Sequence, residues 1–154
     1  MRLLVTLDGS AMCEVVLGPA ADLAQSSQAE VRLYSVLNRY DIAYLSLLHD
    51  RLGNPPPPDE KVVEAEARLL REVREMLADK ADAFISRGVT ADFIADVGSP
   101  ADLIVAQARD WGADLIAMAT HGRSGLIEQL LGSVSSSVLR SGVAPVLLVW
   151  SGRG

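Results

Sequence analysis

Apolar residues in this chain gather in five short runs, and longer stretches with helical spacing lie between them. The runs are rich in Val, Leu and Ile and too short for buried helices, which is typical of strands covered on both faces. They span residues 2–7, 30–37, 90–97, 113–119 and 146–150. The resulting β-α-β-α-β-α-β-α-β order predicts a parallel sheet with helices on both faces, a three-layer α/β sandwich. From the length of 154 residues we expect one domain, residues 1–154.

The first two helices are predicted from apolar residues at three- and four-residue spacing. The first covers residues 10–26, with Ser10 as N-cap and a kink at Pro19, because proline removes a hydrogen bond inside a helix. The second covers residues 59–87 and ends at Gly88. Its predicted apolar face comprises Val62, Leu69, Val73, Met76, Leu77, Ala81 and Phe84.

Glycine and proline mark the remaining boundaries. Ser99 is an expected N-cap, Pro100 suits the first helical position, and Gly112 ends the third helix. Gly132 opens the fourth. The irregular segment 38–58 contains four successive prolines, which favour an extended spacer. Both a lid over a ligand and a solvent-facing linker are consistent with such a segment.

A glycine-rich loop follows the strand predicted at residues 113–119. Gly122 lies where that strand ends, and Gly132 with Ser133 and Val134 begins the next helix. Glycine lets a ligand approach the backbone closely, and free N–H groups at a helix N-terminus favour an anion. The stretch is consistent with phosphate binding, but glycine-rich turns after strands are also common without any ligand.

The spacing of this loop resembles the nucleotide-binding signature of the universal stress protein family. That signature reads Gly, two residues, Gly, nine residues, Gly, and then Ser or Thr. Gly122, Gly132 and Ser133 match it, whereas Ala119 stands in place of the first glycine. The resemblance runs from Met1 to about Trp150. It implies a Rossmann-like fold of the adenine nucleotide α-hydrolase type, with a five-stranded parallel sheet in the order 3-2-1-4-5.

In that order the winding of the sheet reverses between strands 1 and 4, and ligands of open α/β sheets bind at such a switch. The resemblance assigns base, sugar and phosphate contacts to residues near this point. They are Thr6, Leu7, Asp8, Val36, Val97, Gly98, Ala119, Gly122, Arg123, Gly132, Ser133 and Val134. Two of these have a plain alternative: Asp8 is also typical of a turn before glycine, and Arg123 of an exposed loop cation.

The resemblance implies a regulatory protein of the stress response that binds ATP or another adenine nucleotide, with Mg²⁺ or Mn²⁺ on the phosphates. Slow ATP hydrolysis is compatible with it. A non-nucleotide interaction module of the same fold and a nucleotide-using enzyme stay open as alternatives. The P-loop pattern is absent, and we assign no catalytic or metal-ligating residue. His121 is expected to be an ordinary hydrogen-bonding or solvent-facing loop residue.

The composition limits which binding partners and which cellular location we expect. The net charge of −6 disfavours nucleic acid, because duplex binding depends on basic residues that neutralise phosphates. No apolar run approaches the roughly 20 residues of a membrane span, and no signal peptide is visible, so we expect a cytoplasmic protein without membrane contact. The single cysteine, Cys13, excludes an internal disulfide. An apolar edge strand at residues 146–150 predicts a homodimer, as the resemblance also implies; protein clients remain unidentified.

Overall fold

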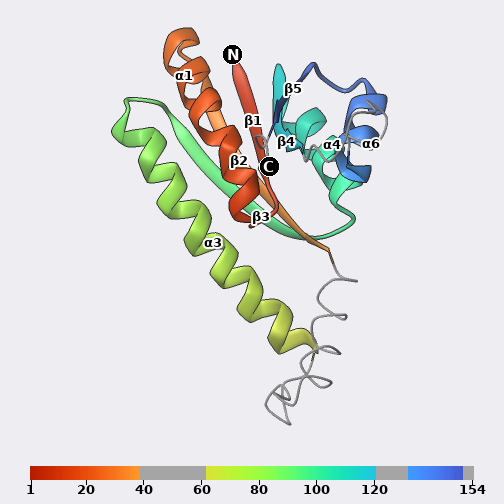
Figure 1. The fold of residues 1–154 in the computed structure, drawn as a ribbon. Coiled ribbons are helices and arrows are strands. Elements are labelled where there is room, and N and C mark those ends of the chain that lie inside the picture. The colour runs from red at the N-terminus through yellow and green to blue at the C-terminus, as the bar shows by residue number, and fades with distance from the viewer. Residues whose placement is uncertain (39–61, 121–131, 151–154) are drawn as a thin grey trace.

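The computed structural model describes residues 1–38, 62–120 and 132–150. Five parallel strands form one sheet in the order β3-β2-β1-β4-β5, which confirms the predicted α/β architecture and strand order (Figure 1). The strands are β1 (Arg2–Leu7), β2 (Glu30–Asn38), β3 (Ala91–Gly98), β4 (Leu115–Thr120) and β5 (Val146–Trp150). The helices are η1 (Ala11–Val16), α1 (Leu17–Ser27), α3 (Val62–Ser86), α4 (Pro100–Trp111) and α6 (Ser133–Ser141).

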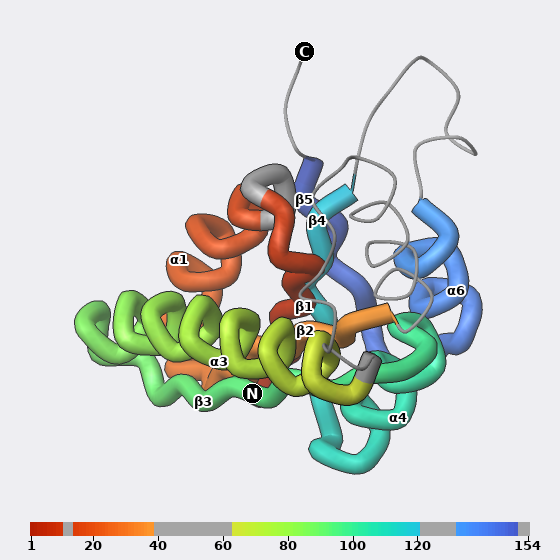
Figure 2. The backbone as a smooth tube through the Cα atoms, turned by 90° about the horizontal axis from the view of Figure 1, so that it is seen from below, coloured from red at the N-terminus to blue at the C-terminus, as the bar shows by residue number. Residues whose placement is uncertain are grey.

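The sheet separates two hydrophobic layers. Figure 2 shows α1 and α3 on one face and α4 and α6 on the other. Side chains alternate between the faces along each strand, so in β1 Leu3 and Val5 pack in the first layer and Leu4 in the second. Each layer contains fully buried side chains, for example Leu77 in the first and Ile116 in the second. None of the helices within residues 1–38, 62–120 and 132–150 has the length and apolar character of a membrane span.

The first helical segment differs from the prediction. A 3₁₀ helix, Ala11–Val16, precedes an α-helix that begins only at Leu17. Pro19 therefore lies in the first turn of α1, where backbone N–H groups have no partner within the helix, and no kink is required. Ser10 is outside both helices, and its own N–H donates to a carboxylate upstream. Ser10 directly precedes the 3₁₀ helix, whereas the expected position of Pro19 in a helix interior was wrong.

The predicted helix ends at Gly88 and Gly112 are confirmed. Both glycines adopt positive φ, 78° and 67°, which ends a helix at little cost only for residues without a Cβ. Pro100 occupies the first turn of α4 as expected. Ser99 sits at the N-cap position, but its side chain makes no capping hydrogen bond. The position was predicted correctly and the bond was not.

Helix α3 runs alongside the strands and extends past their carboxyl ends, so its two ends have different surroundings (Figure 1). Its C-terminal half buries Leu77, Ala81 and Phe84 in the first layer, as predicted. In its N-terminal half, Leu70 rather than Leu69 packs against that layer. Leu69 instead faces the carboxyl edge of the sheet, where it lines a cavity.

At the amino end of the same sheet, two arginines flank one indole ring. The Arg32 guanidinium carbon lies 4.6 Å from the centroid of the Trp111 ring, and that of Arg2 lies 5.9 Å from it. Arg32 Nε donates to Asp92 on the neighbouring strand at 2.8 Å, and Arg2 Nη1 donates to the Trp111 carbonyl at 2.9 Å. This cluster, Arg2, Arg32, Asp92 and Trp111, ties β1, β2 and β3 to the end of α4.

Candidate functional site

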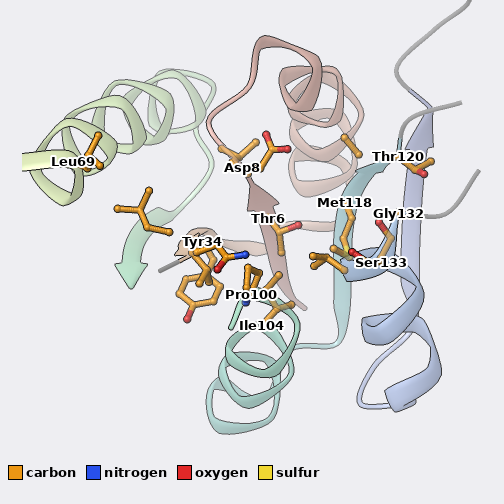
Figure 3. A pocket seen from close by; sticks show the side chains of 17 residues that line it. Thr6, Asp8, Tyr34, Leu69, Pro100, Ile104, Met118, Thr120, Gly132 and Ser133 are labelled. Carbon is orange, nitrogen blue, oxygen red and sulfur yellow. The ribbon is translucent and has the colours of Figure 1, made fainter. Parts of the chain in front are cut away.

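A cavity of about 580 Å³ opens at the carboxyl ends of β1, β2 and β4, beside the N-termini of α4 and α6 (Figure 3). Its volume is within the range of small-molecule sites, roughly 300–1,000 Å³. The position is the predicted one, since β1 and β4 are adjacent and chain winding reverses between them. Eight residues of the predicted site line it: Thr6, Leu7, Asp8, Val36, Ala119, Gly132, Ser133 and Val134.

Four residues of the predicted site remain: two are described and do not line the cavity, and two are not described. Val97 and Gly98 are absent from its described lining. At Gly98 an added Cβ would lie 2.8 Å from Leu103 Cδ1, so the end of this leucine side chain would have to shift to make room. Gly122 and Arg123 lie outside the described residues, as does His121.

The N-terminus of α6 forms one wall of the cavity. Gly132 is its N-cap residue, and glycine has no side chain with which to cap the terminus. The first intrahelical bond runs from Ser136 N–H to the Gly132 carbonyl at 2.9 Å, so the preceding N–H groups of the first turn have no acceptor within the helix. A helix start of this kind attracts an anion through its N–H groups and its dipole. The Ser133 hydroxyl lies beside it on the cavity wall.

The turn after β1 brings a carboxylate to the rim. Asp8 Oδ1 accepts the N–H of Ser10 at 2.8 Å, and Gly9 between them adopts a φ of 80°. This is the turn role that the sequence offered as the alternative for Asp8. The two roles coexist geometrically, because Asp8 also lines the cavity (Figure 3).

The floor of the cavity is mostly apolar and deeply buried. Tyr34 is 1% exposed, Met118 4% and Ile104 5%. Thr6, 7% exposed, adds a hydroxyl to this floor. A flat apolar group with polar edges is the kind of ligand portion that such a surface fits.

One tyrosine on the floor is fixed by a partner on the next strand. The Tyr34 hydroxyl donates to Asp96 Oδ2 at 2.8 Å, between β2 and β3. Burial raises the pKa of the Tyr34 phenol strongly, and the bond to Asp96 raises this pKa further. The phenol is therefore a neutral donor at any ordinary pH.

Several lining residues were missed from the sequence. Tyr34, Ile104 and Met118 read as ordinary core positions, and nothing in their spacing distinguishes floor from core. Pro100 was assigned correctly to the start of a helix, and that assignment alone could have located it, since the helix begins at the carboxyl edge of the sheet. Leu69 was predicted to belong to the apolar face of its helix, and this spacing gave no sign that it lines a cavity.

The described residues include no group of three or more His, Cys, Asp or Glu that could hold a metal ion. Cys13 lies in η1, and its side chain is outside the described part of the chain. The described lining of the cavity thus offers N–H groups for an anion at one end and a buried floor for an apolar ring at the other.

A sequence model of the universal stress protein family matches residues 1–149. The chain belongs to the universal stress protein family. Among its relatives, the universal stress protein YxiE of Bacillus subtilis is 32% identical over 148 residues, 96% of this chain and 97% of that protein. The universal stress protein MJ0577 of Methanocaldococcus jannaschii is 30% identical over 151 residues, 96% of this chain and 93% of that protein.

Solved structures of universal stress proteins share the fold. The structure of MJ0577 superposes with a TM-score of 0.74 at 27% identity, covering 99% of this chain and 97% of that one. A universal stress protein from Archaeoglobus fulgidus in complex with dAMP has a TM-score of 0.62 at 21% identity, covering 96% of each chain. The second likeness concerns the fold alone.

Proposed function

We propose that this universal stress protein binds an adenine nucleotide, with ATP as the expected ligand, and acts as a regulatory module in a stress response. Three features support the proposal: the cavity at the switch point of the sheet, the uncapped start of α6 on its wall, and membership of the family. The Archaeoglobus fulgidus relative that carries dAMP supports an adenine ligand in this fold.

The lining suggests how the nucleotide would lie. The adenine would rest on the buried floor formed by Ile104 and Met118, near Thr6 and Val36. The phosphates would meet the N–H groups at Ser133 and Val134, where the helix dipole favours negative charge. The sugar would then span the tips of β1 and β4, between these two regions.

A divalent cation, Mg²⁺ or Mn²⁺, would come with the phosphates. Such ions take oxygen ligands and bind readily to phosphate groups. The described lining offers oxygen donors for such an ion, among them the Asp8 carboxylate and the Ser133 hydroxyl. The proposed activity is binding, with hydrolysis at most slow.

The observation that carries the proposal is the meeting of the α6 N-terminus with the β1 tip in one cavity. Isothermal titration calorimetry with ATP, and with tripolyphosphate as a ligand that lacks adenosine, tests it directly. We expect ATP to bind at micromolar concentration and tripolyphosphate to bind more weakly, because it cannot use the floor. Failure of ATP, ADP and AMP all to bind would favour the non-nucleotide interaction module.

We also propose a homodimer through β5. This strand is at the edge of the sheet, and Trp150 at its end is 47% exposed. An unpaired apolar edge is a surface that another strand can join. Sedimentation at micromolar concentration should show a dimer, and Trp150→Lys should shift it toward monomer. Wild-type protein that sediments only as a monomer would refute this. The proposed location is the cytoplasm, with protein clients that respond to the bound nucleotide.

A further inference from the structure

Two side-chain pairs join β2 to β3 on the same face of the sheet. Arg32 pairs with Asp92 near the amino end. Tyr34 lies two residues farther along β2 and pairs with Asp96, which lies four residues farther along β3. The first pair belongs to the cluster around Trp111, away from the cavity. The second includes a residue of the cavity floor. The pairs are thus matched in strand and face but differ in their relation to the cavity.

The Tyr34 ring and its hydroxyl have separate surroundings. The residue is 1% exposed and lines the cavity, while Figure 3 shows the hydroxyl directed away from Thr6 and Met118. The hydroxyl is therefore turned toward β3, where it donates a hydrogen bond to Asp96 Oδ2 at 2.8 Å. A ligand in the cavity would meet the ring and not the hydroxyl.

Asp96 stands two residues before the turn that starts α4. Gly98 ends β3, and Leu103 N–H donates to the Ser99 carbonyl at 3.0 Å to open the helix. Pro100, next in the chain, lines the cavity together with Tyr34. The Tyr34–Asp96 bond thus links the floor on β2 to the corner that carries the α4 wall.

We propose that Tyr34 and Asp96 act as a positioning pair for the nucleotide site, in which Asp96 fixes the Tyr34 ring and the β3–α4 corner rather than contacting the ligand. This inference rests on the proposed nucleotide binding. It gives Asp96 a role other than the ligand contact that the resemblance implied for its neighbours Val97 and Gly98. The strongly raised pKa of Tyr34 agrees with a phenol that stays protonated and keeps this bond.

A double-mutant cycle on ATP affinity separates positioning from direct contact. We expect Tyr34→Phe and Asp96→Ala each to weaken ATP binding about fivefold, which corresponds to the loss of one hydrogen bond. The double variant should also be only about fivefold weaker, because both changes remove the same bond. Asp96→Asn should stay within about twofold of wild type, since its amide oxygen still accepts from the tyrosine.

Asp92→Ala is the matched control. It breaks the neighbouring pair between the same strands, so it should lower the free energy of unfolding while ATP affinity stays within about twofold of wild type. If Asp96→Ala does not fold, Asp96→Leu, which also removes the acceptor but fills more of the space, takes its place in the cycle with the same expected losses.

Additive losses in the double variant, about 25-fold in total, would overturn the proposal, because they would show that the two residues act independently. Loss of affinity in Asp96→Asn equal to that in Asp96→Ala would also overturn it, since the charge itself would then be needed by the ligand. Wild-type protein that binds no adenine nucleotide would overturn both this inference and the proposed function. Binding by wild type with an additive cycle would overturn this inference alone.

Discussion

The amino and carboxyl ends of this side of the sheet share three elements, β1, β2 and α4, and have opposite characters. At the amino end, Arg2, Arg32, Asp92 and Trp111 fill the space with stacking and ion pairs. At the carboxyl end, the same elements line a cavity of about 580 Å³ together with β4 and α6. The filled end holds the elements together, and this allows the other end to remain open for a ligand. Substitutions at the two ends should therefore separate stability from binding.

The largest effect is expected at the open end from Gly132→Val. A Cβ at Gly132 would have Ser135 Oγ as its nearest contact, at 4.0 Å, so the fold has room for a side chain. The ligand does not, because the phosphate would approach this backbone directly. We expect ATP affinity to fall at least about a hundredfold, or about 2.7 kcal/mol, with little change in unfolding free energy. Calorimetry and urea unfolding of the same preparation measure both. Undiminished affinity would contradict the phosphate site.

The second effect, on stability, appears at high pH and concerns Tyr34, which lies between the two ends. Its pKa in the folded protein is raised above the ordinary value of about 10. Between these two values the unfolded chain loses a proton that the folded chain keeps, so stability falls as pH rises. Below pH about 10 this contribution is fully present. Above it, wild type should lose up to about 1.4 kcal/mol per pH unit more than Tyr34→Phe. Urea unfolding of both proteins at pH 9 and pH 11 measures the difference. An equal change of unfolding free energy with pH in wild type and Tyr34→Phe would contradict this prediction.

At the filled end, Arg32→Leu should lower the free energy of unfolding by about 1 kcal/mol, because it removes both the stacking on Trp111 and the pair with Asp92. ATP affinity should stay within about twofold of wild type. Glu72→Ala is the control, since it removes an exposed pair with Arg68 inside α3 and should cost less than about 0.5 kcal/mol. A large loss of ATP affinity in Arg32→Leu would show that the two ends are not separate.

The smallest effect tests the wall opposite α6. Leu69→Ala should weaken ATP binding about threefold, with stability nearly unchanged, because this side chain lines the cavity and is not in the core. Leu70→Ala, one residue along, should do the reverse and lower unfolding free energy by about 1 kcal/mol. If both variants changed only stability, Leu69 would not face the ligand.

Much of this fold was predictable, because its signals are local. Apolar runs located the five strands, and Gly88 and Gly112 ended their helices at positive φ, as glycine allows. The first helix was predicted too early, since a 3₁₀ segment and an α-helix share the same apolar spacing over one or two turns. The position of Pro19 relative to the true helix start decided whether it caused a kink, and that start was not visible in the sequence.

The site was predictable where a residue type matters for backbone chemistry and unpredictable where only its direction matters. Gly132 and Asp8 were found because glycine and a turn carboxylate are recognisable after a strand or before a helix. Tyr34 and Asp96 are 62 positions apart, and their pairing depends on the β2–β3 register. Leu69 and Leu70 differ only by a rotation about the helix axis. No spacing rule separates them without knowing how far α3 extends past the sheet.

That extension of α3 has a mechanical consequence. This one helix packs in the first hydrophobic layer with Leu77, Ala81 and Phe84, and it lines the cavity at the carboxyl edge of the sheet with Leu69. A substitution that tilts the packed half of α3 therefore also moves Leu69 relative to the cavity opening. Substitutions in the first layer, which no ligand would contact, can in this way change the width of that opening.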